Sequence, residues 1–184
     1  FGPVGWRRLG LDIDGEAADD QSGYSVSLSS DGTIVAIGAY KNYGTRGHVR
    51  IYQYANSTWT RLGNDIDGEA ANDQSGYSVS LSSDGTIVAI GAILNSGNGY
   101  QSGHVRVYQY ANSTWTQLGD DIDGEAAGNQ SGWSVSLSSD GTTVAIGAYN
   151  NDENGGYSGH VRVYQYANST WTQLGQDIDG ETSN

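Results

Sequence analysis

The chain has no cysteine, no methionine and only one proline among its 184 residues. Without cysteine it can form no disulfide framework and no thiolate metal site, and it offers no cysteine nucleophile. Because methionine is absent even at position 1, we expect a processed or excised piece of a longer product. No apolar run approaches the roughly 18 residues that span a bilayer, and no signal segment stands at Phe1, so we predict no membrane insertion.

Basic side chains are also scarce, because Lys and Arg total 8 against 21 Asp and Glu. The net charge of -13 repels nucleic acid and anionic membranes, so we expect no nucleic-acid partner. The 28 glycines and the hydrophobic share of 36% favour a turn-rich β protein over a helical one.

A repeated unit dominates what is present. Four tryptophans stand 53, 56 and 56 residues apart, and residues 104–119 are identical to residues 160–175. The units differ mainly in three stretches that we interpret as loops away from the shared packing, residues 41–46, 94–101 and 150–157. We therefore divide the chain into a surplus outer strand with an acidic loop (1–22) and three blades (23–75, 76–131 and 132–184).

We predict four short strands in each unit. In the first, large apolar residues alternate with Ser, which is the period of a strand. An Asp-Gly hairpin turn leads into an apolar second strand, which we expect to be buried on both faces. The third strand begins Gly-His-Val-Arg, and Asn-Ser-Thr turns the chain into the fourth, Trp-Thr-Gln-Leu-Gly or, in the first unit, Trp-Thr-Arg-Leu-Gly.

No 3.6-residue apolar period appears anywhere, so we predict an all-β protein. Four antiparallel strands, joined as a meander and repeated, are typical of β-propeller blades. A sheet with two apolar faces must be covered on both, and packing against like blades achieves this without a helix. The predicted architecture is three tandem four-stranded antiparallel blades plus one surplus outer strand.

The order Ser-Gly-Tyr-Ser-Val, Val-Ala-Ile-Gly-Ala-Tyr and Gly-His-Val-Arg-Val-Tyr resembles the FG-GAP repeat of integrin α-subunit β-propellers, over essentially the whole chain. The family's Phe-Gly becomes Ser-Gly here, and its Gly-Ala-Pro becomes Gly-Ala-Tyr or Gly-Ala-Ile. The resemblance implies that the tryptophan strand is outermost. Many family members bind calcium in a loop between the first and second strands, but a tight Asp-Gly turn leaves no room for six or seven oxygen ligands.

Most of the acidic residues lie in four copies of one loop that contains Asp-Ile-Asp-Gly-Glu. One interpretation is a calcium site in each loop, with ligands drawn from Asp65, Asp67, Glu69, Asp121, Asp123 and Glu125. The other is a solvated loop whose Asp side chains form turns with their own backbone. No Glu stands at the twelfth position that calcium loops use, so we predict no metal and no cofactor, with calcium as the alternative.

Three Asn-Ser-Thr turns precede the outer strands and match the N-glycosylation signal, which predicts modification at Asn56, Asn112 and Asn168. Such hairpin tips are exposed, as a glycan requires. The alternative is that Asn and Ser are only turn-forming residues here. Asn129 also matches the signal, but beside an inner strand where we expect less access.

Nothing in the sequence supports catalysis. The three histidines His48, His104 and His160 occupy equivalent positions, which indicates packing between blades together with the Arg and Tyr of the same strand face. A catalytic site needs different residues that converge at one place in the protein. The sequence offers no residues that could form a nucleophile–base pair. We therefore predict that the protein is not an enzyme.

Most aromatic residues fall at repeated strand positions, where we expect core packing. Five tyrosines instead border the variable loops and are our candidates for a binding surface, Tyr40, Tyr43, Tyr100, Tyr149 and Tyr157.

Three blades do not close a propeller ring, which usually needs four to eight. Repeat ends without caps expose apolar faces and strand edges. We therefore expect an extracellular structural or adhesive protein that self-assembles, as a closed oligomer or a filament, by strand exchange at its ends. The alternative is a lectin-like or protein-binding module that recognises glycans or cell-surface proteins through residues 40–48, 93–103 and 149–159. The chain could also belong to a longer repeat array.

Overall fold

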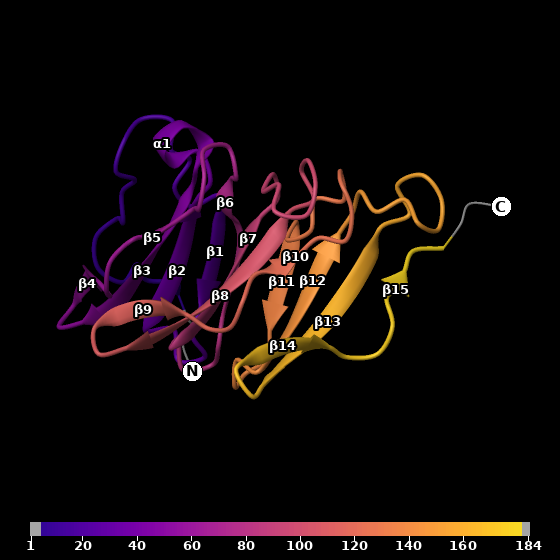
Figure 1. The fold of residues 1–184 in the computed structure, drawn as a ribbon. Coiled ribbons are helices and arrows are strands. Elements are labelled where there is room, and N and C mark those ends of the chain that lie inside the picture. Colours follow the sequence, from indigo (N-terminus) through magenta and orange to yellow (C-terminus); the bar gives the residue numbers. More distant parts are fainter. Residues whose placement is uncertain (1–4, 182–184) are drawn as a thin grey trace.

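A computed structural model describes residues 5–181 and shows an all-β protein made of three antiparallel sheets (Figure 1). The sheets follow one another along the chain and stand side by side, from unit 1 in indigo to unit 3 in yellow (Figure 1). The predicted fold class is therefore confirmed. Within the described residues, no helix has the length and apolar character needed to cross a membrane.

Each sheet has the predicted four strands in meander order, with the tryptophan strand at the outer edge, and one further two-residue strand. Unit 1 consists of β1 (Ser25–Leu28), β2 (Ile34–Ala39), β3 (His48–Ala55), β4 (Thr58–Arg61) and β5 (Ile66–Asp67). Unit 2 consists of β6 (Ser75–Leu81), β7 (Ile87–Ala92), β8 (His104–Ala111), β9 (Thr114–Gln117) and β10 (Ile122–Asp123). Unit 3 consists of β11 (Ser134–Leu137), β12 (Thr143–Ala148), β13 (His160–Ala167), β14 (Thr170–Gln173) and β15 (Ile178–Asp179).

The short fifth strand was not expected. It comes from the acidic loop and pairs with the start of the third strand, where Ile66 lies opposite Val49 and Asp67 opposite His48. Two residues are too few to show an alternating pattern, so the sequence carried no strand signal there. This pairing places the acidic loop beside β3, next to β4 at the edge of the sheet.

The surplus outer strand expected in residues 1–22 does not form among the described residues 5–22. Residues 1–4 and 182–184 of the predicted units lie outside the described part. An outer strand such as β4 forms its ladder on the third strand of its own unit, with Tyr54 opposite Trp59. Among residues 5–181 no third strand pairs with the segment around Trp6, and this residue is 103% exposed.

The Asp-Gly hairpins form as predicted, and the Asp side chain organises each turn. In unit 1 the Asp31 carboxylate accepts hydrogen bonds from the Thr33 N–H at 2.9 Å and the Ser29 hydroxyl at 2.7 Å. Gly32 follows with a φ of 72°, a left-handed conformation that glycine adopts without strain. These hydrogen bonds hold the pKa of Asp31 below its usual value.

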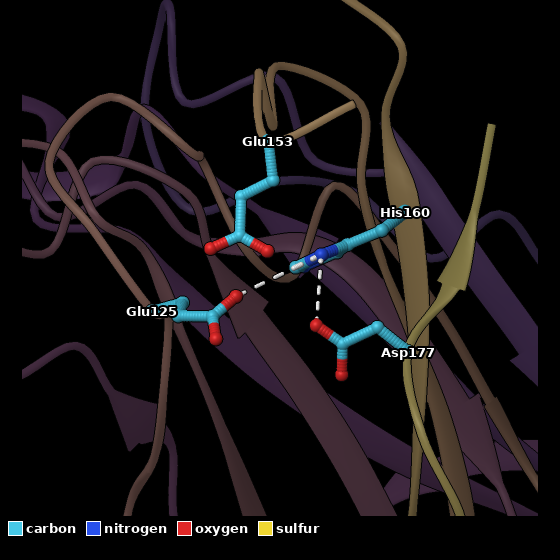
Figure 2. Close-up of side chains that lie close together, drawn as sticks. All are labelled: Glu125, Glu153, His160 and Asp177. Carbon is cyan, nitrogen blue, oxygen red and sulfur yellow. Dashed lines mark ion pairs between the residues drawn. The ribbon is translucent and has the colours of Figure 1, made fainter. Parts of the chain in front are cut away.

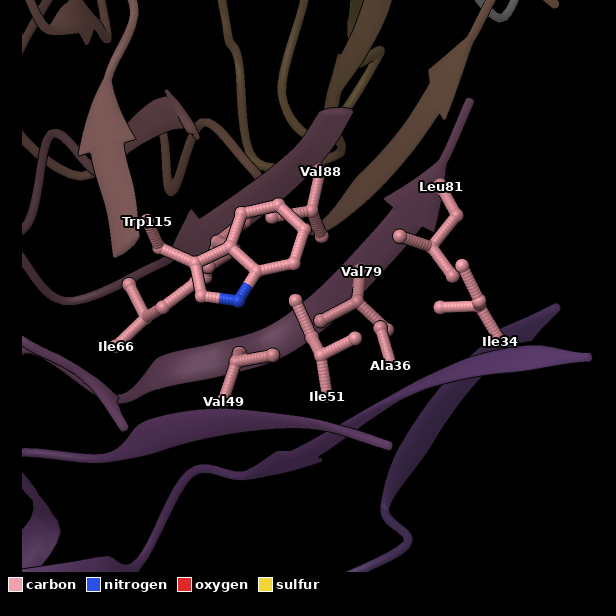
Figure 3. Close-up of a cluster of buried hydrophobic side chains, with 10 residues drawn as sticks. Ile34, Ala36, Val49, Ile51, Ile66, Val79, Leu81, Val88 and Trp115 are labelled. Carbon is pink, nitrogen blue, oxygen red and sulfur yellow. The ribbon is translucent and has the colours of Figure 1, made fainter. Parts of the chain in front are cut away.

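The core lies between the sheets. One face of unit 1, with Ile34 and Ile51, packs against Val79 and Leu81 of unit 2 and against Trp115 (Figure 3). Units 2 and 3 repeat the arrangement, because Val105 and Val107 pack with Val144 and Ile146, and the partly buried Val135 and Leu137 pack against this cluster. The sheet of unit 2 is therefore covered on both faces by its neighbours, and the sheets of units 1 and 3 are each covered on one.

Glycines allow the inner strands of adjacent units to touch. A Cβ at Gly38 would lie 2.1 Å from the carbonyl oxygen of Gly76, and one at Gly91 would lie 2.1 Å from that of Gly132. Serine hydroxyls bond across the same contacts, Ser25 to the Gly76 carbonyl at 2.7 Å and Ser78 to the Gly132 carbonyl at 2.6 Å. Polar and steric fit therefore set the register between units.

Each outer-strand tryptophan rests on the unit before it. The Trp115 Nε1–H donates to the Leu62 carbonyl at 2.8 Å, and its ring covers Gly63, which leaves no space for a Cβ. The same contact joins Trp171 to Leu118 at 2.7 Å and Trp59 to Leu9 at 2.8 Å. The segment around Leu9 thus takes the place of a preceding unit.

We predict that Trp115→Phe lowers the free energy of unfolding by about 1–2 kcal/mol, because the Leu62 carbonyl loses its donor. Trp6→Phe is the matched control and should change stability by less than about 0.5 kcal/mol, since this side chain is fully exposed. Urea unfolding followed by far-UV circular dichroism measures both. Equal losses in the two variants would contradict the role of the tryptophan hydrogen bond.

Candidate functional site

A polar cluster, which we call the junction cluster, lies where each unit meets the next. The third strand begins His-Val-Arg, and the two-residue period places His and Arg on the same face. In unit 1, Arg50 donates two hydrogen bonds of 2.9 Å to Asp65, which directly precedes β5. Its Nη2 also lies 2.9 Å from a carboxylate oxygen of Glu16, which belongs to the preceding segment.

The cluster recurs with the same roles in the other units. Arg106 binds Asp121 at 2.7 and 2.9 Å and Glu69 of unit 1 at 2.8 Å. Arg162 binds Asp177 at 3.0 Å and forms an ion pair with Glu125 of unit 2. The acidic loop repeats with the same spacing, so it supplies each arginine with one carboxylate from its own unit and one from the preceding segment or unit.

Burial and hydrogen bonding act in opposite directions on these carboxylates. Burial alone would raise the pKa of Asp121, but hydrogen bonds from Arg106 and Gln117 outweigh it and hold the pKa below its usual value. Burial of the His104 ring lowers the pKa of this histidine, and nearby Asp121 offsets part of the effect. The cluster therefore contains ionised carboxylates beside a histidine that burial favours in its neutral form.

The three histidines are buried, at 3%, 3% and 6% exposure, as the packing interpretation requires. Their Nδ1 atoms face the carboxylates rather than an apolar neighbour. The Nδ1 of His104 lies 3.5 Å from Asp121, and that of His160 lies 3.5 Å from Asp177, yet neither Nδ1 forms a hydrogen bond to any described residue. The sequence did not predict that these carboxylates face the histidines, because the acids come from a loop for which no packing partner was predicted.

Within the described residues, the three acids proposed as calcium ligands in each loop do not form a converging group of their own. Asp65 and Asp121 bind arginines of their own units, whereas Glu69 and Glu125 reach the next unit. Asp67 and Asp123 lie in the short strands β5 and β10. Four of the six therefore bind arginines in the junction clusters, and Asp123 lies 4.0 Å from the Nδ1 of His104.

The five candidate tyrosines fall into two groups. Three project from the variable loops and are at least 74% exposed, Tyr43, Tyr100 and Tyr157. The other two belong to a row of touching rings that crosses all three units, with centroids 4.1–5.4 Å apart, Tyr40, Tyr24, Tyr77, Trp133 and Tyr149. The sequence located the exposed residues correctly but gave no sign of the row, whose members are far apart in the chain.

The Asn-Ser-Thr signals lie where they were expected. Asn56 and Ser57 form the exposed tip between β3 and β4, with φ of 52° and 63°, and the other two hairpins repeat this geometry at Asn112 and Asn168. Asn129 is buried, and its side-chain oxygen accepts the Ala126 N–H at 2.7 Å. Three of the four predicted asparagines are therefore accessible in the folded chain.

The model of the FG-GAP repeat family matches residues 66–108 and 122–164. These two stretches of the chain are FG-GAP repeats. Each matched stretch runs from the short fifth strand of one unit into the third strand of the next, so it contains the Glu, His and Arg of one junction cluster but not its Asp. No curated protein matches the chain in sequence.

Solved structures share the fold of this chain. A Bacteroides uniformis protein assigned as a 6-phosphogluconolactonase is 15% identical, with a TM-score of 0.55 over 86% of this chain and 40% of its own. Saccharomyces cerevisiae Sqt1 is 15% identical, with a TM-score of 0.54 over 90% and 37%. Kuenenia stuttgartiensis hydrazine synthase is 13% identical, with a TM-score of 0.52 over 87% and 38%.

These neighbours include propeller-type proteins, so the propeller-type fold of the repeats is confirmed. The chain spans 40% or less of the length of each. At such low identity the likeness extends to the fold alone.

We predict that Arg106→Gln destabilises the chain by about 2 kcal/mol, because Asp121 and Glu69 lose their shared cation in a partly buried place. Arg8→Gln provides the comparison, since Arg8 and Asp12 form an exposed pair that contributes about 0.5 kcal/mol or less. Thermal and urea unfolding of both variants measure the difference. If Arg106→Gln unfolds like the wild-type chain, the junction cluster does not hold the units together.

Proposed function

We propose that this chain is an extracellular, non-enzymatic module for assembly or adhesion, which associates head to tail with further copies of itself. The observation that carries the proposal concerns the two end faces of the stack. They correspond to the two faces that pack together at each internal interface. A face that is buried between units is exposed at the opposite ends of the stack.

The apolar surfaces support this proposal. Val79 and Leu81 of β6 are 9% and 7% exposed, because unit 1 covers them. The equivalent Val26 and Leu28 of β1 are 62% and 59% exposed. The other end of the stack exposes Ile178, whose counterpart Ile66 is buried in unit 1.

The glycines support the same pairing of ends. Gly38 and Gly91 touch the backbone of the following unit, whereas a Cβ at the equivalent Gly147 would meet only Ser134 of its own unit within 4 Å. A Cβ at Gly23, the counterpart of the docked Gly76, would meet nothing within that distance. An open pocket of about 470 Å³ lies at Gly147 and is lined also by Trp133 and Val161. The Ser22-Gly23 segment of a second copy fits this place as Ser75-Gly76 fits unit 1.

Head-to-tail stacking involves an exchange of equivalent segments. Residues 9–16 read Leu-Gly-Leu-Asp-Ile-Asp-Gly-Glu, and residues 174–181 read Leu-Gly-Gln-Asp-Ile-Asp-Gly-Glu. In one chain, Leu9 and Glu16 contact Trp59 and Arg50 of its own unit 1. In the assembly, the segment 174–181 of the neighbouring copy takes over these contacts, which is a form of strand exchange.

We predict that Leu28→Arg weakens self-association at least tenfold, because a guanidinium would be buried without a partner at the interface. Thr116→Arg is the matched control, since it makes the same charge change on the exposed outer strand of unit 2. Sedimentation velocity over a concentration series measures association. A wild-type chain that stays a 19.4 kDa monomer at all concentrations contradicts the proposal.

A second variant reports on the exchange itself. A chain that begins at Gly23 lacks the competing segment around Leu9, so it should associate more strongly than the full chain. Circular dichroism establishes that the shortened chain is folded. Association that stays the same or weakens in this folded variant argues against segment exchange.

The extracellular assignment rests on the three exposed Asn-Ser-Thr tips. We predict that the chain secreted from a eukaryotic cell carries additional mass that an N-glycosidase removes. Replacing Asn56, Asn112 and Asn168 together by Gln should abolish this mass, whereas Asn129→Gln should leave it unchanged, because Asn129 is buried. Mass spectrometry of the intact chain measures each result. Secretion without any attached glycan contradicts this part of the proposal.

A second candidate function is the binding of glycans or cell-surface proteins through the variable loops. It is favoured by the three exposed loop tyrosines, since aromatic faces provide large, rigid contact surfaces. The module then recognises a partner at the loop ends while its end faces serve assembly. Screening the monomeric chain against immobilised glycans separates this function from self-association. Nucleic acid and membrane insertion have no place in either candidate.

A further inference from the structure

We propose that the junction cluster between units 2 and 3 is a binding site for a transition-metal dication of the zinc type, held by Glu125, Glu153, His160 and Asp177. One ligand atom from each residue lies within 4.8 Å of all the others. Figure 2 shows the four side chains converging from three directions, with His160 between the acids. The site lies within one chain and does not depend on self-assembly.

The atoms available to a cation are those that the protein leaves unused. The Oδ1 atom of Asp177 accepts hydrogen bonds from Arg162 and Gln173, and Arg162 forms an ion pair with Oε1 of Glu125. The other oxygens, Asp177 Oδ2 and Glu125 Oε2, lie 3.5 and 3.9 Å from His160 Nδ1. Each carboxylate thus has one oxygen fixed by the protein and the other directed at the histidine.

Two of these atoms are buried without a partner. Neither His160 Nδ1 nor Glu125 Oε2 forms a hydrogen bond with any of residues 5–181. His160 as a whole is 6% exposed, so bulk water does not satisfy its ring nitrogen. Buried polar atoms normally have hydrogen-bond partners, and a site for an ion is one of the recognised reasons for an exception. A cation among these atoms would satisfy both.

Charge distinguishes this cluster from the other two. Three carboxylates and the Arg162 guanidinium leave two negative charges in excess, which one dication neutralises. In unit 2 the converging group holds only Glu69, His104 and Asp121, and Arg106 leaves it one negative charge in excess. Asp123 lies 4.0 Å from the Nδ1 of His104 but outside that group. In unit 1, Arg50 and Arg61 offset both carboxylates of the cluster.

The extra carboxylate comes from the variable loop. Glu153 lies at the position that Gly97 occupies in unit 2, in loops of equal length. A Cβ built at Gly97 would lie 3.1 Å from Asp123, so this loop position faces the acidic strand of its own unit. A substitution in the most divergent part of the repeat therefore completes the ligand set in one unit.

The ligand types indicate which ion binds. Zinc takes histidine nitrogen and carboxylate oxygen in tetrahedral sites with bonds of about 2.0–2.2 Å, so its ligand atoms lie about 3.3–3.6 Å apart. His160 Nδ1 and Asp177 Oδ2 already have this separation, at 3.5 Å. The exposed Glu153 side chain can close the remaining gap by rotation. Calcium prefers six to eight oxygen ligands, which this cluster does not offer.

The test is calorimetric titration of the metal-free chain with Zn²⁺, with Co²⁺ as a probe whose visible absorption reports a tetrahedral site. We expect one equivalent of Zn²⁺ per chain, competition between Co²⁺ and Zn²⁺, and a melting temperature that rises with Zn²⁺ concentration. Glu153→Gln should weaken Zn²⁺ binding at least tenfold. Glu153 is exposed on a loop, so this variant should fold normally, and circular dichroism checks that it does.

Asp152→Asn is the control variant. It removes the same charge from the adjacent residue, and the new amide oxygen can still accept the Tyr157 N–H as Asp152 does. Its affinity for Zn²⁺ should match that of the wild-type chain. The absence of Zn²⁺ binding, an equal loss in both variants, or binding of Ca²⁺ in preference to Zn²⁺ would overturn the proposal.

Discussion

The structure depends on one constraint, which is that a four-stranded sheet with apolar residues on both faces is stabilised only where another sheet covers them. Val79 and Leu81 become buried only because Ile34 and Ile51 of the preceding unit cover them. The hydrophobic effect thus acts mainly between units and only secondarily within them. The tryptophan contacts, the paired glycines and the junction clusters all refine this packing by fixing one sheet on the next.

Polar groups give the stacking its direction. Glu69 reaches forward to Arg106, whereas Trp115 reaches back to Leu62, so every interface has a distinct front and back. Like charges would meet if a unit stacked in reverse. A directional interface between identical units joins them in only one order, which is why the end faces suit head-to-tail assembly rather than a symmetric dimer.

Much of the fold could be predicted because it rests on local pattern. Alternation marked β1, the Asp-Gly turns marked the hairpins, and the repeat marked the number of sheets. The short strand at Ile66 and the aromatic row through Tyr77 could not be predicted, because neither has a local signal. The junction clusters were also missed. Their members were recognised as acids and packing histidines, but bringing Glu125 to His160 requires the three-dimensional stacking of units.

Repetition also explains where a specific site can arise. Residues that form the interface are under the same packing constraint in every unit, so Arg50, Arg106 and Arg162 keep one role. The variable loops carry no such constraint and can acquire different side chains at little cost in stability. Glu153 is the result of this freedom. It directs one added carboxylate at a histidine that the fold has already buried, and three otherwise equivalent junctions become chemically different.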